Sequence, residues 1–283
     1  MKYVKASRYQ LVLFTLLVVG QMLIASRSVS AKPALGKKWS SEDLVSMAKI
    51  DHSAFSQLLQ KYVDSDGYVD YKSWRASKID RNALRSYLAH LSQADPNRRT
   101  NKNALIAFWI NAYNAVTLEG ILQVYPTTSI RNHTAKVFGF NIWKDLPLLV
   151  GNRQYSLNDI EHEILRKQGE PRVHFAIVCA SISCPRLLNS AYQAKTLDEQ
   201  LTLNAKDFFS RSGNFRADSR QRTIYLSSIL DWFSSDFGRS QSAKLKYLAP
   251  YLPKSAQTLA ANPQTRVKYL EYNWNLNDQS RKR

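Results

Sequence analysis

The sequence contains few cysteines, glycines and prolines, and this scarcity excludes several classes of protein. Two cysteines in 283 residues are too few for a disulfide-dense small domain or for a zinc ribbon held by four cysteines. Nine glycines and nine prolines are too few for a collagen-like or low-complexity chain. Hydrophobic residues make up 44% and aromatic residues 11% of the chain, so it can bury a core of its own.

Several common functional motifs are also absent. The sequence has no GxSxG, Walker, GxGxxG or HExxH pattern, which removes the commonest hydrolase, nucleotide-binding and zinc-protease hypotheses. Cys179 and Cys184 are spaced Cys-x4-Cys, which is not one of the usual zinc spacings. We therefore expect neither a bound metal nor a cofactor.

Acidic residues are scarce relative to basic ones. Lys and Arg number 40 against 22 Asp and Glu, which gives a net charge of +18. The basic residues are scattered, because only 98–99 and 281–283 form tight clusters. A scattered charge is typical of a solvated surface, and it favours an anionic envelope surface as a partner over nucleic acid, which we do not expect.

The first residues are typical of a secretory signal peptide. Lys2, Lys5 and Arg8 precede an apolar run over 11–25, and a small-x-small pattern ends at Ala31. We expect cleavage near Ala31, which would lower the net charge to +14, and a periplasmic or secreted protein. No later apolar run reaches 18 residues without a charge, so we expect no transmembrane segment in the mature chain.

The hydrophobic pattern predicts a single α+β domain over 46–283, preceded by an extended leader over 32–45. Residues 103–124 are apolar on almost every side, which predicts a buried central helix packed with other helices against a small β-sheet. The other expected elements are helices beginning near Ser40, Ser156 and Thr196, the last two with capping boxes, and strands over 173–179 and 223–226.

The central helix carries a polar stripe. At 100° per residue, Asn111, Asn114 and Thr117 share one face of an otherwise apolar helix. A buried amide is costly unless its hydrogen bonds are made. The two asparagines therefore either line a polar binding site or tie loops to the core.

The helix over 156–166 places a carboxylate where an apolar residue is expected. Glu161 falls at the centre of the apolar face, and His162 falls on its edge. Burial raises the pKa of a carboxyl group that lacks a cation or several donors, and such acids gather at functional sites. The alternative is a structural ion pair for Glu161, with His162 at the boundary of the core.

The segment over 173–185 holds both cysteines, and several interpretations stay open. In the first interpretation, Cys179 and Cys184 form a disulfide, as an oxidising compartment would allow. In the second, Cys179 is a nucleophile activated by a histidine, and in the third the two cysteines form a redox-active dithiol. In a regular strand His174 and Cys179 point to opposite faces, which makes His162 the better base unless the strand bulges.

Four blocks of the sequence resemble the domain of unknown function 547 family. They are AFWINAYNA at 107–115, LNDIEHEILR at 157–166, VHFAIVCASISCP at 173–185 and YNWNLN at 272–277. The resemblance covers most of residues 50–277, but it implies no activity. A helix with an amide stripe beside a segment with histidine and cysteine is also similar to the layout of papain-like and transglutaminase-like thiol enzymes.

Together these features predict a polar cleft and two classes of function. The first is a thiol-dependent hydrolase or acyl transferase that acts on a peptide or amide. The alternative is a non-catalytic envelope-binding module, with a structural Cys179–Cys184 disulfide and a basic surface for anionic ligands. The residues expected to line the cleft are Cys179 as nucleophile, His162 or His174 as base, Glu161 to orient the base, and Asn111 and Asn114 for hydrogen bonds to the substrate.

Overall fold

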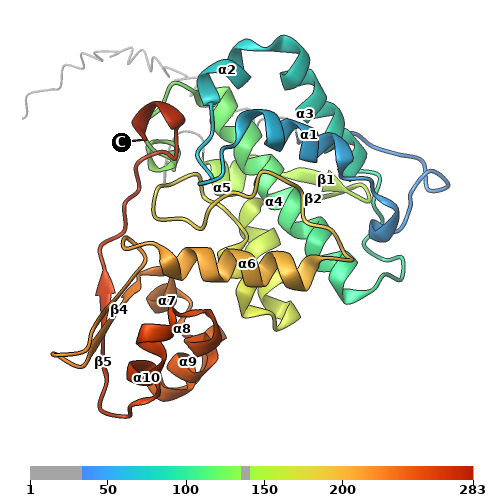
Figure 1. The fold of residues 1–283 in the computed structure, drawn as a ribbon. Helices are drawn as coiled ribbons and strands as arrows, with labels where there is room; N and C mark the ends of the chain where they lie inside the picture. Colours follow the sequence, from blue (N-terminus) through green and yellow to red (C-terminus); the bar gives the residue numbers. More distant parts are fainter. Residues whose placement is uncertain (1–33, 135–140, 283) are drawn as a thin grey trace, which may run out of the picture. The chain divides into compact units, whose positions relative to one another are not determined.

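The computed structural model describes residues 34–134 and 141–282, and the expected signal peptide over 1–31 lies outside them. From Ala31 onward the chain forms one compact unit. Helices predominate in it, with two small sheets, so the predicted single α+β domain is confirmed (Figure 1). In the described part of the expected leader, the amide of Leu35 donates to the carbonyl of Pro147, at 2.8 Å.

The first half of the unit consists of helices packed around one long central helix (Figure 1). These helices are α1 (Ser53–Tyr62), α2 (Tyr71–Ala76), α3 (Lys78–Leu91) and α4 (Lys102–Val124). Helix α4 begins after Asn101, whose side chain accepts the amide of Ala104, and it ends before Pro126. By length and hydropathy α4 could cross a membrane, but 94% of its apolar window is buried inside the unit. It is the predicted core helix.

Short elements connect α4 to the segment that holds the cysteines. They are α5 (Ile142–Asp145), the antiparallel pair β1 (Leu148–Val150) and β2 (Arg153–Tyr155), η3 (Asp159–Leu165), η4 (Arg166–Gln168) and η5 (Pro171–Phe175). The capping box is confirmed: the Ser156 hydroxyl accepts the Asp159 amide at 3.2 Å, and the Asp159 carboxylate accepts the Ser156 amide at 2.9 Å. However, η3 is a π-helix rather than the expected regular α-helix.

The second half forms another small core around a three-stranded sheet (Figure 1). Strand β4 is antiparallel to β3 and parallel to β5. After β5 the chain returns to the first core, where Leu276 is fully buried. The elements are α6 (Leu197–Ser210), β3 (Phe215–Asp218), β4 (Thr223–Ser227), α7 (Ile229–Trp232), α8 (Ser234–Phe237), α9 (Gln241–Leu248), α10 (Lys254–Ala261) and β5 (Arg266–Leu270).

The predicted strand over 173–179 is wrong. The chain instead makes the 3-10 helix η5, in which the amide of Ala176 donates to the carbonyl of Val173, and then continues as an irregular loop. The loop is buried without a neighbouring strand because Asn114 supplies the missing partners. Its side chain donates to the Ala176 carbonyl and accepts the Val178 amide, at 3.0 and 2.9 Å.

One predicted helix start and one predicted capping box also differ from the structure. The Ser40 hydroxyl donates to the Asp43 carboxylate within a turn, and the first α-helix begins only at Ser53. Helix α6 does follow Thr196, but the expected capping box is not formed. The Thr196 hydroxyl contacts the side-chain oxygen of Gln200, one residue beyond the position that a capping box uses.

Candidate functional site

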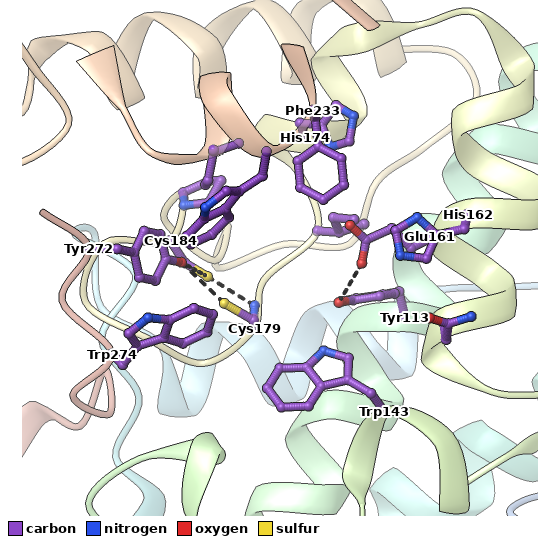
Figure 2. A pocket seen from close by; sticks show the side chains of 15 residues that line it. Tyr113, Trp143, Glu161, His162, His174, Cys179, Cys184, Phe233, Tyr272 and Trp274 are labelled. Carbon is purple, nitrogen blue, oxygen red and sulfur yellow. Dashed lines mark hydrogen bonds between the residues drawn. The ribbon is translucent and has the colours of Figure 1, made fainter. Parts of the chain in front are cut away.

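A cavity of about 200 Å³ brings together residues that are far apart in the sequence (Figure 2). Its lining includes Glu161, His162, His174, Cys179 and Cys184, all of which we had selected from the sequence. The cavity lies between η3, the cysteine loop, helix α7 and the segment that follows β5. Five of the predicted site residues therefore share one site.

Asn111 and Asn114 do not line this cavity. Both are buried on α4, and each uses its amide as a two-way clamp on the backbone. Asn111 donates to the carbonyl of Tyr192 at 2.8 Å and accepts the amide of the same residue at 2.9 Å. Asn114 clamps the cysteine loop as described above. The expectation that they bind substrate is thus corrected: they tie two loops to the central helix.

The sulfur of Cys184 is surrounded by hydrogen-bond donors. The backbone amide of Cys179 donates to it at 3.0 Å, the Ser181 hydroxyl at 3.3 Å, and the Tyr272 hydroxyl lies 3.2 Å away. Burial disfavours a thiolate, but these donors and the thiol of Cys179 outweigh it and lower the pKa of Cys184 to about 6. The surroundings of Cys184 therefore favour its thiolate form.

Cys179 holds the proton of this pair. Its sulfur lies 3.2 Å from the Ser181 and Tyr272 hydroxyls, and the neighbouring charge of Cys184, together with burial, raises its pKa well above the usual range. Both residues are free cysteines in the structure, so the disulfide considered from the sequence is not formed in it. The side chain of Cys179 is the more exposed of the two.

A tight turn between the cysteines creates this arrangement. Ala180 has φ +56°, in the left-handed region that favours glycine, and the Cys184 amide donates to the Ser181 carbonyl at 3.1 Å. The turn folds the loop back so that the Cys179 amide faces the Cys184 sulfur. A strained residue directly beside a cysteine is typical of a functional loop.

His174 is held by a carboxylate that the sequence did not reveal. Its Nε2 lies 2.8 Å from Asp236, and Arg166 donates two hydrogen bonds to the same carboxylate, at 2.6 and 2.8 Å. Arg166 holds the pKa of Asp236 well below its usual range, so the carboxylate is ionised and can only accept. The Nε2 of His174 therefore carries the hydrogen, and in the neutral ring the lone pair is on Nδ1.

The surroundings of His174 keep its ring neutral. It is 3% exposed and stacks on Phe233, with ring centroids 4.2 Å apart. Burial lowers its pKa, although Asp236 opposes the change. A neutral, oriented imidazole beside an ionised carboxylate is the arrangement of a general base.

His162 has a different role from the one we expected. Arg166, which can only donate, gives a hydrogen bond to its Nδ1 at 3.1 Å. Burial and the charge of Arg166 lower the pKa of His162. Its Nδ1 lone pair is thus occupied and its Nε2 carries the hydrogen, so in this arrangement His162 is a donor rather than a base.

Glu161 is a carboxyl group with an unusually high pKa. Burial raises the pKa of Glu161 to about 7, and the charge of Cys184 also raises it. The Tyr113 hydroxyl, which donates a hydrogen bond to the carboxylate at 3.2 Å, lowers the pKa and so opposes the effect of burial. Figure 2 shows Tyr113 and Glu161 pointing toward each other across the cavity from the thiols. Near neutral pH, Glu161 can therefore hold a proton and release it.

The remaining wall of the cavity is aromatic. Trp232 and Trp274 stack with their ring centroids 5.6 Å apart, and the ring centroids of Tyr272 and Trp274 are 4.5 Å apart. Trp143 contributes another ring (Figure 2), and Trp232 is 49% exposed. Rings of this kind offer flat apolar faces to a ligand.

Sequence reasoning missed several residues of the site. Asp236 lies in α8 without any spacing that relates it to His174, and only the fold brings them together. Tyr113 and Tyr272 lie within the blocks that resemble the family, but nothing in those blocks distinguished them from core aromatics. Within residues 34–134 and 141–282, no group of three or more His, Cys, Asp or Glu is arranged to hold a metal ion.

The fold and the cavity together define an α+β domain with a thiol-lined site. Residues 97–209 match the family described as "Protein of unknown function, DUF547". The protein is therefore a DUF547 domain-containing protein, as the resemblance implied. The matched range includes α4, η3 and both cysteines, whereas Asp236 and Tyr272 lie beyond it. No curated protein and no solved structure matches the chain.

Proposed function

We propose that the protein is a cysteine-dependent hydrolase or acyl transferase that acts on a peptide or amide. The observation that carries the proposal is the donor set around Cys184, on the wall of a cavity that also holds an oriented histidine and an acid with a pKa of about 7. A thiolate, a base and a proton donor on one cavity are the groups that acyl transfer needs.

Cys184 replaces Cys179 as the proposed nucleophile. The thiolate, not the thiol, attacks a carbonyl, and the donors hold the charge on Cys184. The strongest geometric support comes from the backbone amide of Cys179, which any side chain at that position retains. Cys179 thus supports Cys184 in two ways, by its backbone amide, which donates to the sulfur, and by its thiol, which lowers the pKa of Cys184.

The other residues supply the proton transfers. The Cys184 thiolate attacks the carbonyl carbon, and as the carbon–nitrogen bond breaks, protonated Glu161 gives its proton to the departing amine. Water, or an acceptor amine or alcohol, then attacks the thioester and gives its proton to Nδ1 of His174, and the thiolate leaves. Asp236 stabilises the imidazolium that forms, and the Nε2 hydrogen of His162 is a donor available to the developing oxyanion.

The test compares two cysteine variants, Cys184→Ala and Cys179→Ala. Iodoacetamide labelling measured across pH should give a midpoint near 6 in the wild type, which Cys179→Ala shifts to higher pH because it removes a hydrogen bond to the Cys184 sulfur, and which Cys184→Ala abolishes. Incubation with p-nitrophenyl acetate, followed by peptide mass mapping, should place the acetyl group on Cys184. Labelling that depends on Cys179 instead, or a midpoint near that of an ordinary thiol, would refute the assignment.

The other expectations from the sequence remain proposals. A non-catalytic module with a Cys179–Cys184 disulfide is less favoured, because the two cysteines are free in this structure and the surroundings of Cys184 lower its pKa. We also propose export, because 1–31 has the pattern of a signal peptide. The intact mass of protein recovered from the periplasm would test this: a chain beginning after Ala31 is expected, and an uncleaved chain would contradict it.

A further inference from the structure

Helices α2 and α3 present a basic surface that is separate from the thiol cavity. Two adjoining hollows are lined by basic residues of these helices, and Arg75 and Arg81 belong to both hollows. None of these residues lines the thiol cavity. The basic residues of the two hollows are Lys72, Arg75, Lys78, Arg81 and Arg85, and we call them the α2–α3 surface.

The acidic residues nearby neutralise little of this charge. Glu119 is fully buried and pairs with Arg81 and Arg85, at 3.1 and 3.2 Å. Asp80 pairs with Lys61 at 2.7 Å and also accepts from two hydroxyl groups. The exposed side chains of Lys72, Arg75 and Lys78 therefore keep their charge facing solvent.

An exposed apolar side chain directly follows one residue of this surface, although it lines neither hollow. Ile79 follows Lys78 on the first turn of α3 and is 81% exposed, more than any other large hydrophobic residue in the described part of the chain. A helix-helix corner held in place by its own core has no structural need for an exposed isoleucine among cations. Cations around a projecting apolar side chain are what binding to an anionic lipid surface needs: the cations meet the head groups, and the apolar side chain enters the interface.

We infer that the α2–α3 surface docks the protein on an anionic lipid bilayer. Arg75 and Lys78 approach the phosphate groups, and Ile79 inserts between the head groups. This inference is independent of the chemistry proposed for the thiol cavity, because no residue is shared between the two. A soluble polyanion would use the cations but would gain nothing from Ile79.

The test is co-sedimentation of the processed chain, which begins after Ala31 and is the compact unit described above, with vesicles. Vesicles of phosphatidylcholine with phosphatidylglycerol should bind the protein at low salt, and vesicles of phosphatidylcholine alone should not. The double variant Arg75→Glu/Lys78→Glu should reduce binding at least about tenfold, and Ile79→Ser should reduce it about threefold with no change in charge.

Helix α6 and the turn directly before it offer matched controls, which we call the α6 variants. Lys195→Glu/Lys206→Glu changes the net charge by the same amount as the double variant, and Leu203→Ser removes an apolar side chain that is 54% exposed. These variants should bind vesicles like the wild type, and all variants should keep the wild-type melting temperature and Cys184 labelling. Absence of binding, equal losses in the α6 variants, or full binding by Ile79→Ser would each overturn the inference, and the last result would indicate that the cations alone bind anionic groups without insertion of Ile79.

Discussion

Glu161 should make the stability of the protein depend on pH in a way that one substitution removes. Its pKa is raised from 4.5 to about 7 in the folded protein, so the folded state binds a proton that the unfolded chain releases. This stabilisation is complete below the pKa of the unfolded chain and is lost as the pH rises through about 7. Each pH unit between the two values is worth about 1.4 kcal/mol, which gives about 3 kcal/mol in all.

The assay is urea unfolding of the wild type and Glu161→Gln at a series of pH values. The variant cannot ionise at this position. As the pH rises from about 4 to about 8, the unfolding free energy of the wild type should therefore fall by about 3 kcal/mol more than that of Glu161→Gln. The difference between the two proteins isolates Glu161. Other groups, such as His52, whose pKa burial lowers to about 4 and whose effect has the opposite sign, contribute equally to both.

Glu163→Gln is the matched control. Glu163 lies on the same π-helix, but its side chain is 61% exposed and makes only a surface pair with Lys167. Its substitution should change the unfolding free energy by less than about 0.5 kcal/mol at any pH. Parallel pH curves for Glu161→Gln and the wild type would refute the argument that burial holds a proton on Glu161.

Two further substitutions test how the site is held. Asp236→Asn removes the carboxylate that Arg166 and His174 share, and it should lower the pKa of His174 further, as measured by NMR titration, and slow hydrolysis of the acetyl-thiol at least about tenfold. An unchanged histidine pKa would show that the contact carries no charge. Asn114→Ala leaves two buried backbone groups of the cysteine loop without partners and should lower the unfolding free energy by about 3 kcal/mol in urea unfolding. A loss below about 1 kcal/mol would mean that the loop finds other partners.

Local patterns predicted the elements whose stabilising contacts are local. The run over 103–124 predicted α4 because it has no polar side to turn toward solvent, and Ser156 and Asp159 predicted a helix start because the two side chains and backbones pair within one turn. The cysteine segment failed for the opposite reason. Its apolar, β-branched residues look like a strand, but its backbone partners are on Asn114, more than sixty residues earlier.

The sequence predicted most of the titratable residues that line the candidate site, but not the chemical role of each. Glu161 stood out because a carboxylate interrupts an apolar face, and the cysteines stood out because they are so few. Roles depend on partners that only the fold supplies. Arg166 occupies the lone pair of His162 and removes it as a base, while Asp236 orients His174. The backbone amide of Cys179, which no sequence pattern encodes, donates a hydrogen bond to the sulfur of Cys184.

The amide clamp on the cysteine loop has a consequence for motion. A loop that lacked such an anchor would open by local fluctuation, and its amide hydrogens would exchange quickly with solvent. The Val178 amide hydrogen donates instead to a side chain on the most deeply buried helix of the unit. Its exchange should therefore require the disruption of α4 itself, so the loop beside the thiols is protected as strongly as the core, and the two sulfurs keep their positions.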